Sequence, residues 1–176
     1  MIATNIAEAA VSMAEAQAYA RVETGEEEAL LAALLRTASA LCESFTGQVL
    51  VARPFEEIIS PGLQWQRLGL TPIRTIEEVA LIAPDGSSAV LPAGAFEVDV
   101  DGRGDGWVRV ADGADKKIRV RGQAGLAIDP NGVPEPLRQG ILRLIAHLFA
   151  TRDGTGGEPP AAVTALWRPY RRMRLA

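Results

Sequence analysis

One long amphipathic segment constrains the fold of this chain more than any other feature. Thr24 is suited to cap a helix, the acidic run at 26–28 favours the first turn of one, and Gly47 is typical of a helix C-terminus. Between these signals, apolar residues recur at three- and four-residue steps, which predicts a helix over 25–46 with one wide buried stripe. The stripe comprises Leu30, Leu31, Leu34, Leu35, Ala38, Leu41, Cys42 and Phe45.

Two further segments have a helical period. Residues 12–20 begin with Ser12 as a candidate cap and Glu15 three positions later, the spacing of a capping box. Residues 135–152 begin beside prolines, which the first turn of a helix tolerates. We expect this helix to pack against the 25–46 helix and to form the core with it. Its apolar face comprises Leu137, Ile141, Leu144, Ile145, Leu148 and Phe149.

The region between the two long helices has a different pattern, of short β-prone runs separated by Pro, Gly and Asp. The sequence Pro84-Asp85-Gly86 predicts a hairpin between two of these runs. Helices on both sides of such runs predict an α+β fold, with a small antiparallel sheet inserted at about 49–123. The candidate strands are residues 49–59, 63–68, 76–83, 89–91, 96–99, 107–110 and 117–121.

The end of the chain differs in composition from the rest. Residues 153–160 are rich in Gly and Pro, which predicts a linker. This linker separates a folded domain at 1–152 from a C-terminal arm at 161–176. Pro169 is expected to interrupt any long helix in the arm, and we predict that Pro159 and Pro160 extend the arm away from the domain. The arm combines apolar side chains with four arginines: Trp167, Arg168, Tyr170, Arg171, Arg172, Arg174 and Leu175.

The composition limits the chemistry that we expect. The chain has one His and one Cys, so an ordinary hydrolase or a zinc site is not expected. His147 and Cys42 lie on helical faces beside apolar residues and are interpreted as packed side chains. The carboxylates of Asp99, Asp101 and Asp105 alternate as in a calcium loop, but Arg103 stands at the fifth position, and a hairpin turn is the preferred interpretation. We expect no catalytic site, cofactor or metal.

Charge is unevenly distributed along the chain. Residues 1–60 carry a net charge of −6, residues 61–134 of −2 and residues 135–176 of +4. No apolar run approaches the length of about 20 residues that spans a bilayer, so we expect a protein of the cytoplasm without a membrane segment. Three roles remain open for the basic end: docking to an acidic surface of a partner protein, contact with nucleic-acid phosphate as a small DNA-binding module, and a solvated tail.

Three segments in order resemble head-to-tail connector proteins, also called adaptor or head-completion proteins, of long-tailed phages and gene transfer agents. Residues 12–50 contain a short helix, an acidic turn and a long helix that ends in Glu-x-x-Thr-Gly, here Glu43, Thr46 and Gly47. Residues 133–154 are similar to the closing helix of the family, with Val-Pro at its start and Ala-His at its centre. Residues 165–175 resemble its Pro-Tyr-Arg-Arg segment.

The resemblance implies a structural protein of the particle neck, assembled first in the cytoplasm of a bacterial host. It implies a ring of subunits, expected to be a dodecamer, beneath the portal protein, with a platform for the stopper or tail terminator protein. In this hypothesis Trp167, Tyr170 and Leu175 occupy apolar clefts of the portal, and the four arginines pair with its acidic groups. DNA passes through the ring without specific binding; Glu26, Glu27 and Glu28 either line that channel or contact a neighbouring subunit.

Overall fold

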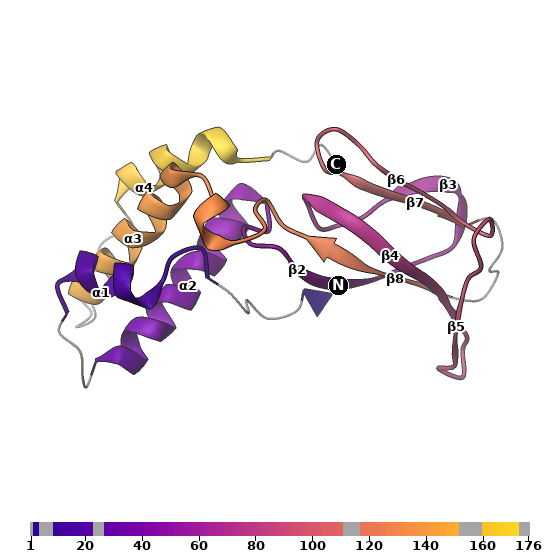
Figure 1. The fold of residues 1–176 in the computed structure, drawn as a ribbon, viewed down its shortest axis with the longest axis horizontal. Helices are drawn as coiled ribbons and strands as arrows, with labels where there is room; N and C mark the ends of the chain where they lie inside the picture. Colours follow the sequence, from indigo (N-terminus) through magenta and orange to yellow (C-terminus); the bar gives the residue numbers. More distant parts are fainter. Residues whose placement is uncertain (1, 4–8, 23–26, 111–116, 152–159, 173–176) are drawn as a thin grey trace. The chain divides into compact units, whose positions relative to one another are not determined.

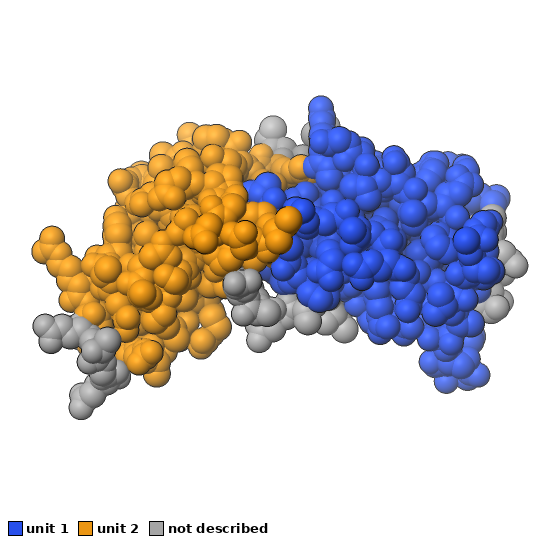
Figure 2. Space-filling view, in the orientation of Figure 1, with its two compact units in different colours: residues 1–7, 52–126 blue, residues 8–51, 127–176 orange. Residues whose placement is uncertain are grey.

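The chain divides into two units, each built from segments that are distant in sequence (Figure 2). Unit 1 comprises residues 1–7 and 52–126, and unit 2 comprises residues 8–51 and 127–176. This division does not coincide with the predicted boundaries at 152 and 160, because the C-terminal segment belongs to unit 2. The computed structural model describes residues 2–3, 9–22, 27–110, 117–151 and 160–172.

Unit 1 consists of two antiparallel sheets, where the sequence predicted one (Figure 1). The five-stranded sheet has the order β1(Ile2–Ala3), β2(Arg53–Ile59), β8(Lys117–Ala124), β4(Ile73–Ile82), β5(Ser88–Val90). The three-stranded sheet has the order β3(Gly62–Arg67), β7(Gly106–Val110), β6(Glu97–Val100). The fold is therefore α+β, and β1 is the strand that the sequence did not predict.

Strand β8 lies at the centre of the larger sheet and alternates buried and less buried side chains. Val120 is fully buried and pairs with both Glu57 of β2 and Val79 of β4. At Gly122 a Cβ would lie 2.0 Å from the carbonyl oxygen of Thr75, so this position requires glycine for the close approach of β4. The predicted hairpin is also present, because residues 80–82 pair with 88–90.

Unit 2 is helical and consists of α1(Met13–Ala20), α2(Glu28–Thr46), α3(Glu135–Ala150) and α4(Ala161–Trp167), followed by a 3-10 turn at Arg168–Tyr170. Helix α3 contacts each of the other three helices. Because three helices pack against α3, its apolar face is largely buried within this unit. The core contains Ala16, Leu31, Leu35, Ala38, Cys42, Leu137, Ile141, Leu144, Ile145, Val163 and Trp167.

The helix boundaries follow the local signals only in part. Ser12 and Glu15 form the predicted capping box at the start of α1. Helix α2 begins at Glu28, three residues after the predicted start, and Glu27 at its N-cap position makes no side-chain capping bond. The predicted cap Thr24 lies outside the described residues. The C-terminal signal was correct, since Gly47 adopts the left-handed conformation with φ of 67°.

Helix α2 is long and apolar enough to cross a bilayer by length and composition, which the sequence analysis did not anticipate. Its buried residues instead cover α3 within unit 2. A helix at the core of a folded unit meets the same length and composition test, and 33% of the α2 segment that meets this test is buried within the unit.

The contacts of Glu15 allow a test of how α1 packs against α3. Its carboxylate accepts from the backbone N–H and hydroxyl of Ser12 and pairs with Arg138 of α3. The hydrogen bonds from Ser12, together with the Arg138 charge, hold the pKa of Glu15 below its ordinary value of 4.5. We expect Glu15→Gln to lower the free energy of unfolding by about 0.5 kcal/mol at pH 7, because glutamine can still form the capping box but loses the charge that pairs with Arg138.

The difference should depend on pH in one direction. A carboxyl group with a lowered folded pKa stabilises the protein fully above its unfolded pKa and loses that contribution as the pH falls through the folded pKa. Urea unfolding of both proteins from pH 7 to pH 3 should therefore show the gap narrowing below about pH 4.5. A gap that stays constant over this range would contradict the assignment.

Candidate functional site

The C-terminal segment folds onto its own unit and is not the extended arm that the sequence predicted. Helix α4 contacts α3 and α2, and in Figure 1 it lies along α3. The 3-10 turn at Arg168–Tyr170 continues directly from α4, so Pro169 ends the α-helix without releasing the chain from the unit.

Trp167 anchors this segment in the core of unit 2. Its side chain is 3% exposed, and its Nε1–H donates to the carbonyl oxygen of Leu137 at 3.2 Å. The ring lies 5.9 Å from that of Phe45, centroid to centroid, in a tilted arrangement. The indole that the sequence assigned to a cleft of another protein is thus buried and hydrogen-bonded within its own unit.

Gly140 of α3 provides the space for Trp167. A Cβ at this position would lie 2.0 Å from Nε1 and 2.7 Å from Cδ1 of the indole. These distances are far below van der Waals contact, so any larger residue at 140 must displace the indole. Sequence reasoning missed this residue, because a glycine inside a helix has no periodic signal of its own.

The Glu-x-x-Thr-Gly motif shapes the end of α2. The backbone N–H of Gly47 donates to the carbonyl oxygen of Glu43 at 2.8 Å, and the Thr46 hydroxyl donates to that of Cys42 at 2.7 Å. The Glu43 carboxylate accepts from the backbone N–H of Leu50 at 2.9 Å. The motif therefore satisfies backbone groups at the helix end and fixes the path of the chain after it.

The same motif receives the C-terminal segment. The backbone N–H of Arg172 donates to the carbonyl oxygen of Thr46 at 2.8 Å. Gln48 donates from Nε2 to the carbonyl oxygen of Tyr170 at 2.6 Å. A Cβ at Gly47 would lie 3.5 Å from the carbonyl oxygen of Arg172. One backbone hydrogen bond and one side-chain hydrogen bond thus join two motifs that are about 120 residues apart in the sequence.

The structure places the predicted arginines differently from one another. Arg168 and Arg171 are exposed, and neither has a carboxylate partner within the described ranges. The Arg171 guanidinium lies 5.5 Å from the centroid of the Phe45 ring, a cation–π contact. Arg172 and Tyr170 are half-buried, whereas Arg174 and Leu175 lie outside the described residues.

A groove of about 290 Å³ lies where α2, α3 and α4 meet. Leu41, at its mouth, is 45% exposed, which is unusual for a leucine on a core helix. The floor is formed by buried residues, including Trp167. None of the lining residues carries a charge; they are Leu41, Ser44, Phe45, Leu144, Val163, Thr164 and Trp167.

The predicted acidic residues of α2 lie at its start. Glu27 is half-buried and Glu28 is exposed in the first turn, while Glu26 lies outside the described residues. Glu28 is near the positive end of the helix dipole, which favours its charge.

The remaining candidates for chemistry have structural roles. Asp101 accepts from the backbone N–H groups of Arg103 at 2.8 Å and Asp105 at 2.9 Å, and the bond from Asp105 is the main reason that the pKa of Asp101 is lowered. Asp105 pairs with Arg67 at 2.7 Å. The described residues contain no group of three metal-ligating side chains. Burial raises the pKa of the Cys42 thiol, which disfavours a reactive thiolate.

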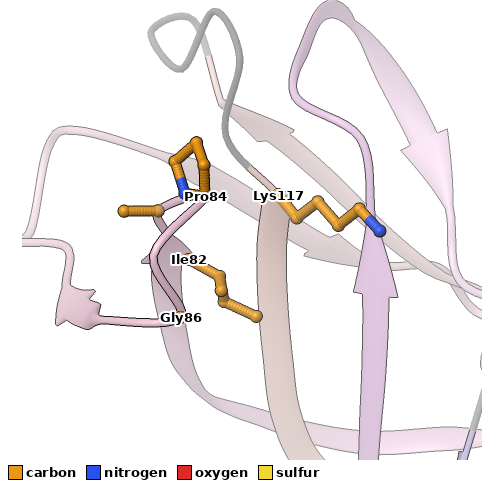
Figure 3. A pocket seen from close by; sticks show the side chains of 5 residues that line it. Ile82, Pro84, Gly86 and Lys117 are labelled. Atoms are coloured by element: carbon orange, nitrogen blue, oxygen red, sulfur yellow. The ribbon is translucent and has the colours of Figure 1, made fainter.

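Unit 1 has a separate cavity of about 390 Å³ beside the β4–β5 turn (Figure 3). It is lined by Ile82, Ala83, Pro84, Gly86 and Lys117. Figure 3 shows Lys117 extending away from Pro84, so the one charged group of this lining is not aimed at the turn. Lys117 is the one titratable residue of this lining, which gives its amine no acid or base partner for catalysis.

Comparison with solved structures identifies the fold. A chain from the neck of an empty gene transfer agent particle, computed with C6 symmetry, aligns with a TM-score of 0.81 at 23% identity, over 100% of this chain and 98% of that chain. This chain shares its fold with a chain of that neck. A chain from the virion of a native gene transfer agent particle aligns with a TM-score of 0.79 at 21% identity, with the same coverage.

A chain from the neck of a native particle, computed with C12 symmetry, gives a TM-score of 0.74 at 20% identity, again over 100% and 98% of the two chains. No family model and no curated protein matches the sequence. The likeness therefore lies in the fold.

Gly140→Ala tests the seating of Trp167. In a helix interior this substitution normally stabilises by about 1 kcal/mol. Here we expect a net loss of about 1–3 kcal/mol, because the new methyl group displaces the indole. Thermal unfolding measures the stability, and limited proteolysis measures release of the C-terminal segment. Gln139→Ala, at the preceding half-buried position, is the control. A Gly140→Ala protein that is more stable than wild type would refute this packing.

Proposed function

We propose that this protein is a structural head-to-tail connector in the neck of a tailed phage or gene transfer agent particle. The full-length fold likeness to a chain of such a neck, at a TM-score of 0.81, carries this proposal. Among the described residues the structure offers no metal-ligating cluster, and its lone cysteine is buried. A structural role in the particle, without catalysis, fits both observations.

In this proposal the subunits form a ring, a dodecamer, beneath the portal protein. The neck structures with the same fold were computed with C6 and C12 symmetry, which supports a cyclic arrangement. The ring gives a platform to the stopper or tail terminator protein, and DNA crosses its centre without specific binding. Glu26, Glu27 and Glu28 serve either as repulsive lining of the channel or as part of the contact between subunits.

The C-terminal segment docks the subunit to the portal. Arg168 and Arg171 are exposed and have no carboxylate partner among the described residues, so both guanidinium groups are available to acidic groups of another protein. Arg172, Arg174, Tyr170 and Leu175 complete the proposed docking segment. Trp167 takes a positioning role, because its burial holds Arg168 and Arg171 on a defined face of unit 2.

Reversal of the two exposed charges tests this docking. In Arg168→Glu/Arg171→Glu, we expect a loss of at least tenfold in the joining of DNA-filled heads to tails, since both contacts with acidic groups become repulsive. The matched control is Arg36→Glu/Arg143→Glu, which reverses two exposed arginines on α2 and α3. Circular dichroism and thermal unfolding should show that all proteins are folded.

Full joining activity in the Arg168→Glu/Arg171→Glu protein would refute the docking role. A DNA-binding module would behave differently: the isolated wild-type protein would bind duplex DNA with a steep salt dependence, and the same double substitution would abolish that binding. That result would favour the alternative function.

A further inference from the structure

We infer that the groove between α2, α3 and α4 is a receptor site for a portal segment that carries a large apolar side chain flanked by acidic residues. The inference rests on the proposed docking to the portal. It exchanges two roles in that docking, because this chain provides the cleft and the portal provides the inserted side chain. The indole that was expected to enter a cleft of the partner instead builds the floor of a cleft in this chain.

The first argument is the apolar character of the groove. Leu41 is 45% exposed at its mouth, and Leu144 and Val163 in its lining are almost fully buried. The exposed Leu41 side chain and the buried apolar side chains of the groove form one continuous apolar surface. A concave apolar surface of this kind is typical of a binding site. Such a surface gains free energy when an apolar side chain replaces water.

The second argument is size. Cavities that hold drug-sized ligands have volumes of about 300–1,000 Å³. The groove, at about 290 Å³, lies just below that range and therefore suits one or two side chains of a partner. A single inserted anchor surrounded by polar contacts is the usual architecture of an interface hot spot.

The third argument is charge. The lining has no charged residue, so the groove itself does not select a sign. The Arg171 guanidinium lies 5.5 Å from the ring centroid of Phe45, which lines the groove. Arg168 directly follows the lining residue Trp167 in the sequence. Both arginines lack a carboxylate partner in the described part of the chain. An occupant with acidic residues beside its apolar anchor therefore complements the groove and its basic neighbours.

The test uses the purified full chain and the purified portal protein of the same particle. Leu41→Asp places a negative charge at the mouth of the groove, and Leu30→Asp makes the same change at a 37% exposed position of α2 outside the groove. We expect Leu41→Asp to weaken portal binding at least tenfold and Leu30→Asp to change it less than twofold. Thermal unfolding checks that both variants are folded.

The occupant is identified by photo-crosslinking. A benzophenone amino acid replaces Ser44, an exposed residue of the lining, and the crosslinked portal peptide is sequenced by mass spectrometry. We expect a peptide with a large apolar residue and at least two Asp or Glu residues within four positions of it. A crosslink to a neutral or basic portal segment, or to a second copy of this chain, would overturn the inference.

The outcomes separate the inference from the proposed function. Wild-type binding together with unchanged binding by Leu41→Asp would overturn the receptor role of the groove and leave portal docking intact. A wild-type chain that does not bind the portal would overturn both.

Discussion

The packing of Trp167 against Gly140 holds the C-terminal segment in unit 2, and the surface that this segment presents depends on it. The indole occupies the space that a side chain at 140 would fill, and its Nε1–H satisfies the carbonyl oxygen of Leu137. A buried indole contributes a large apolar area, and truncation of such a residue typically costs about 3–5 kcal/mol. Together with the buried Val163, Trp167 holds in the helical core a helix of seven residues that would not be stable alone. The buried side of the C-terminal segment therefore stabilises unit 2, and its exposed arginines, Arg168 and Arg171, are the groups proposed to dock a partner.

Several features of the candidate site follow from that anchor. Because α4 is seated, the chain beyond it reaches the end of α2, where Thr46 and Gln48 bind the backbone of Arg172 and Tyr170. The Glu-x-x-Thr-Gly motif thus has a physical explanation: Glu43 and Gly47 fix the helix end, and Thr46 presents a carbonyl oxygen to the returning segment. The groove exists only when Val163 and Trp167 are in place to line it. The exposed arginines are then held on a folded surface, so less conformational entropy is lost when a partner binds them.

Local patterns in the sequence predicted most of the elements, with β1 and α4 as exceptions, but not the contacts that define the site. The capping box at Ser12, the stop at Gly47, the period of α2 and α3 and the turn at 84–86 are local signals, and each is present in the structure. Division of the strands into two sheets depends on pairings across the unit, which no local pattern encodes. The seat of Trp167 was missed for the same reason, since it depends on a glycine 27 residues away on another helix. The Arg and aromatic residues at 167–172 indicated a binding segment, but their composition could not distinguish a free arm from a folded one.

Hydrogen–deuterium exchange of the isolated full-length chain tests most directly whether the C-terminal segment belongs to its own unit. If Trp167 is seated as described, the hydrogen-bonded backbone amides near the end of α4, and that of Arg172, should exchange slowly, with protection approaching that of the α3 core. Exchange of these amides at the rate of an unfolded peptide, while α3 remains protected, would contradict the account. The segment would then be a free arm that folds only on a partner.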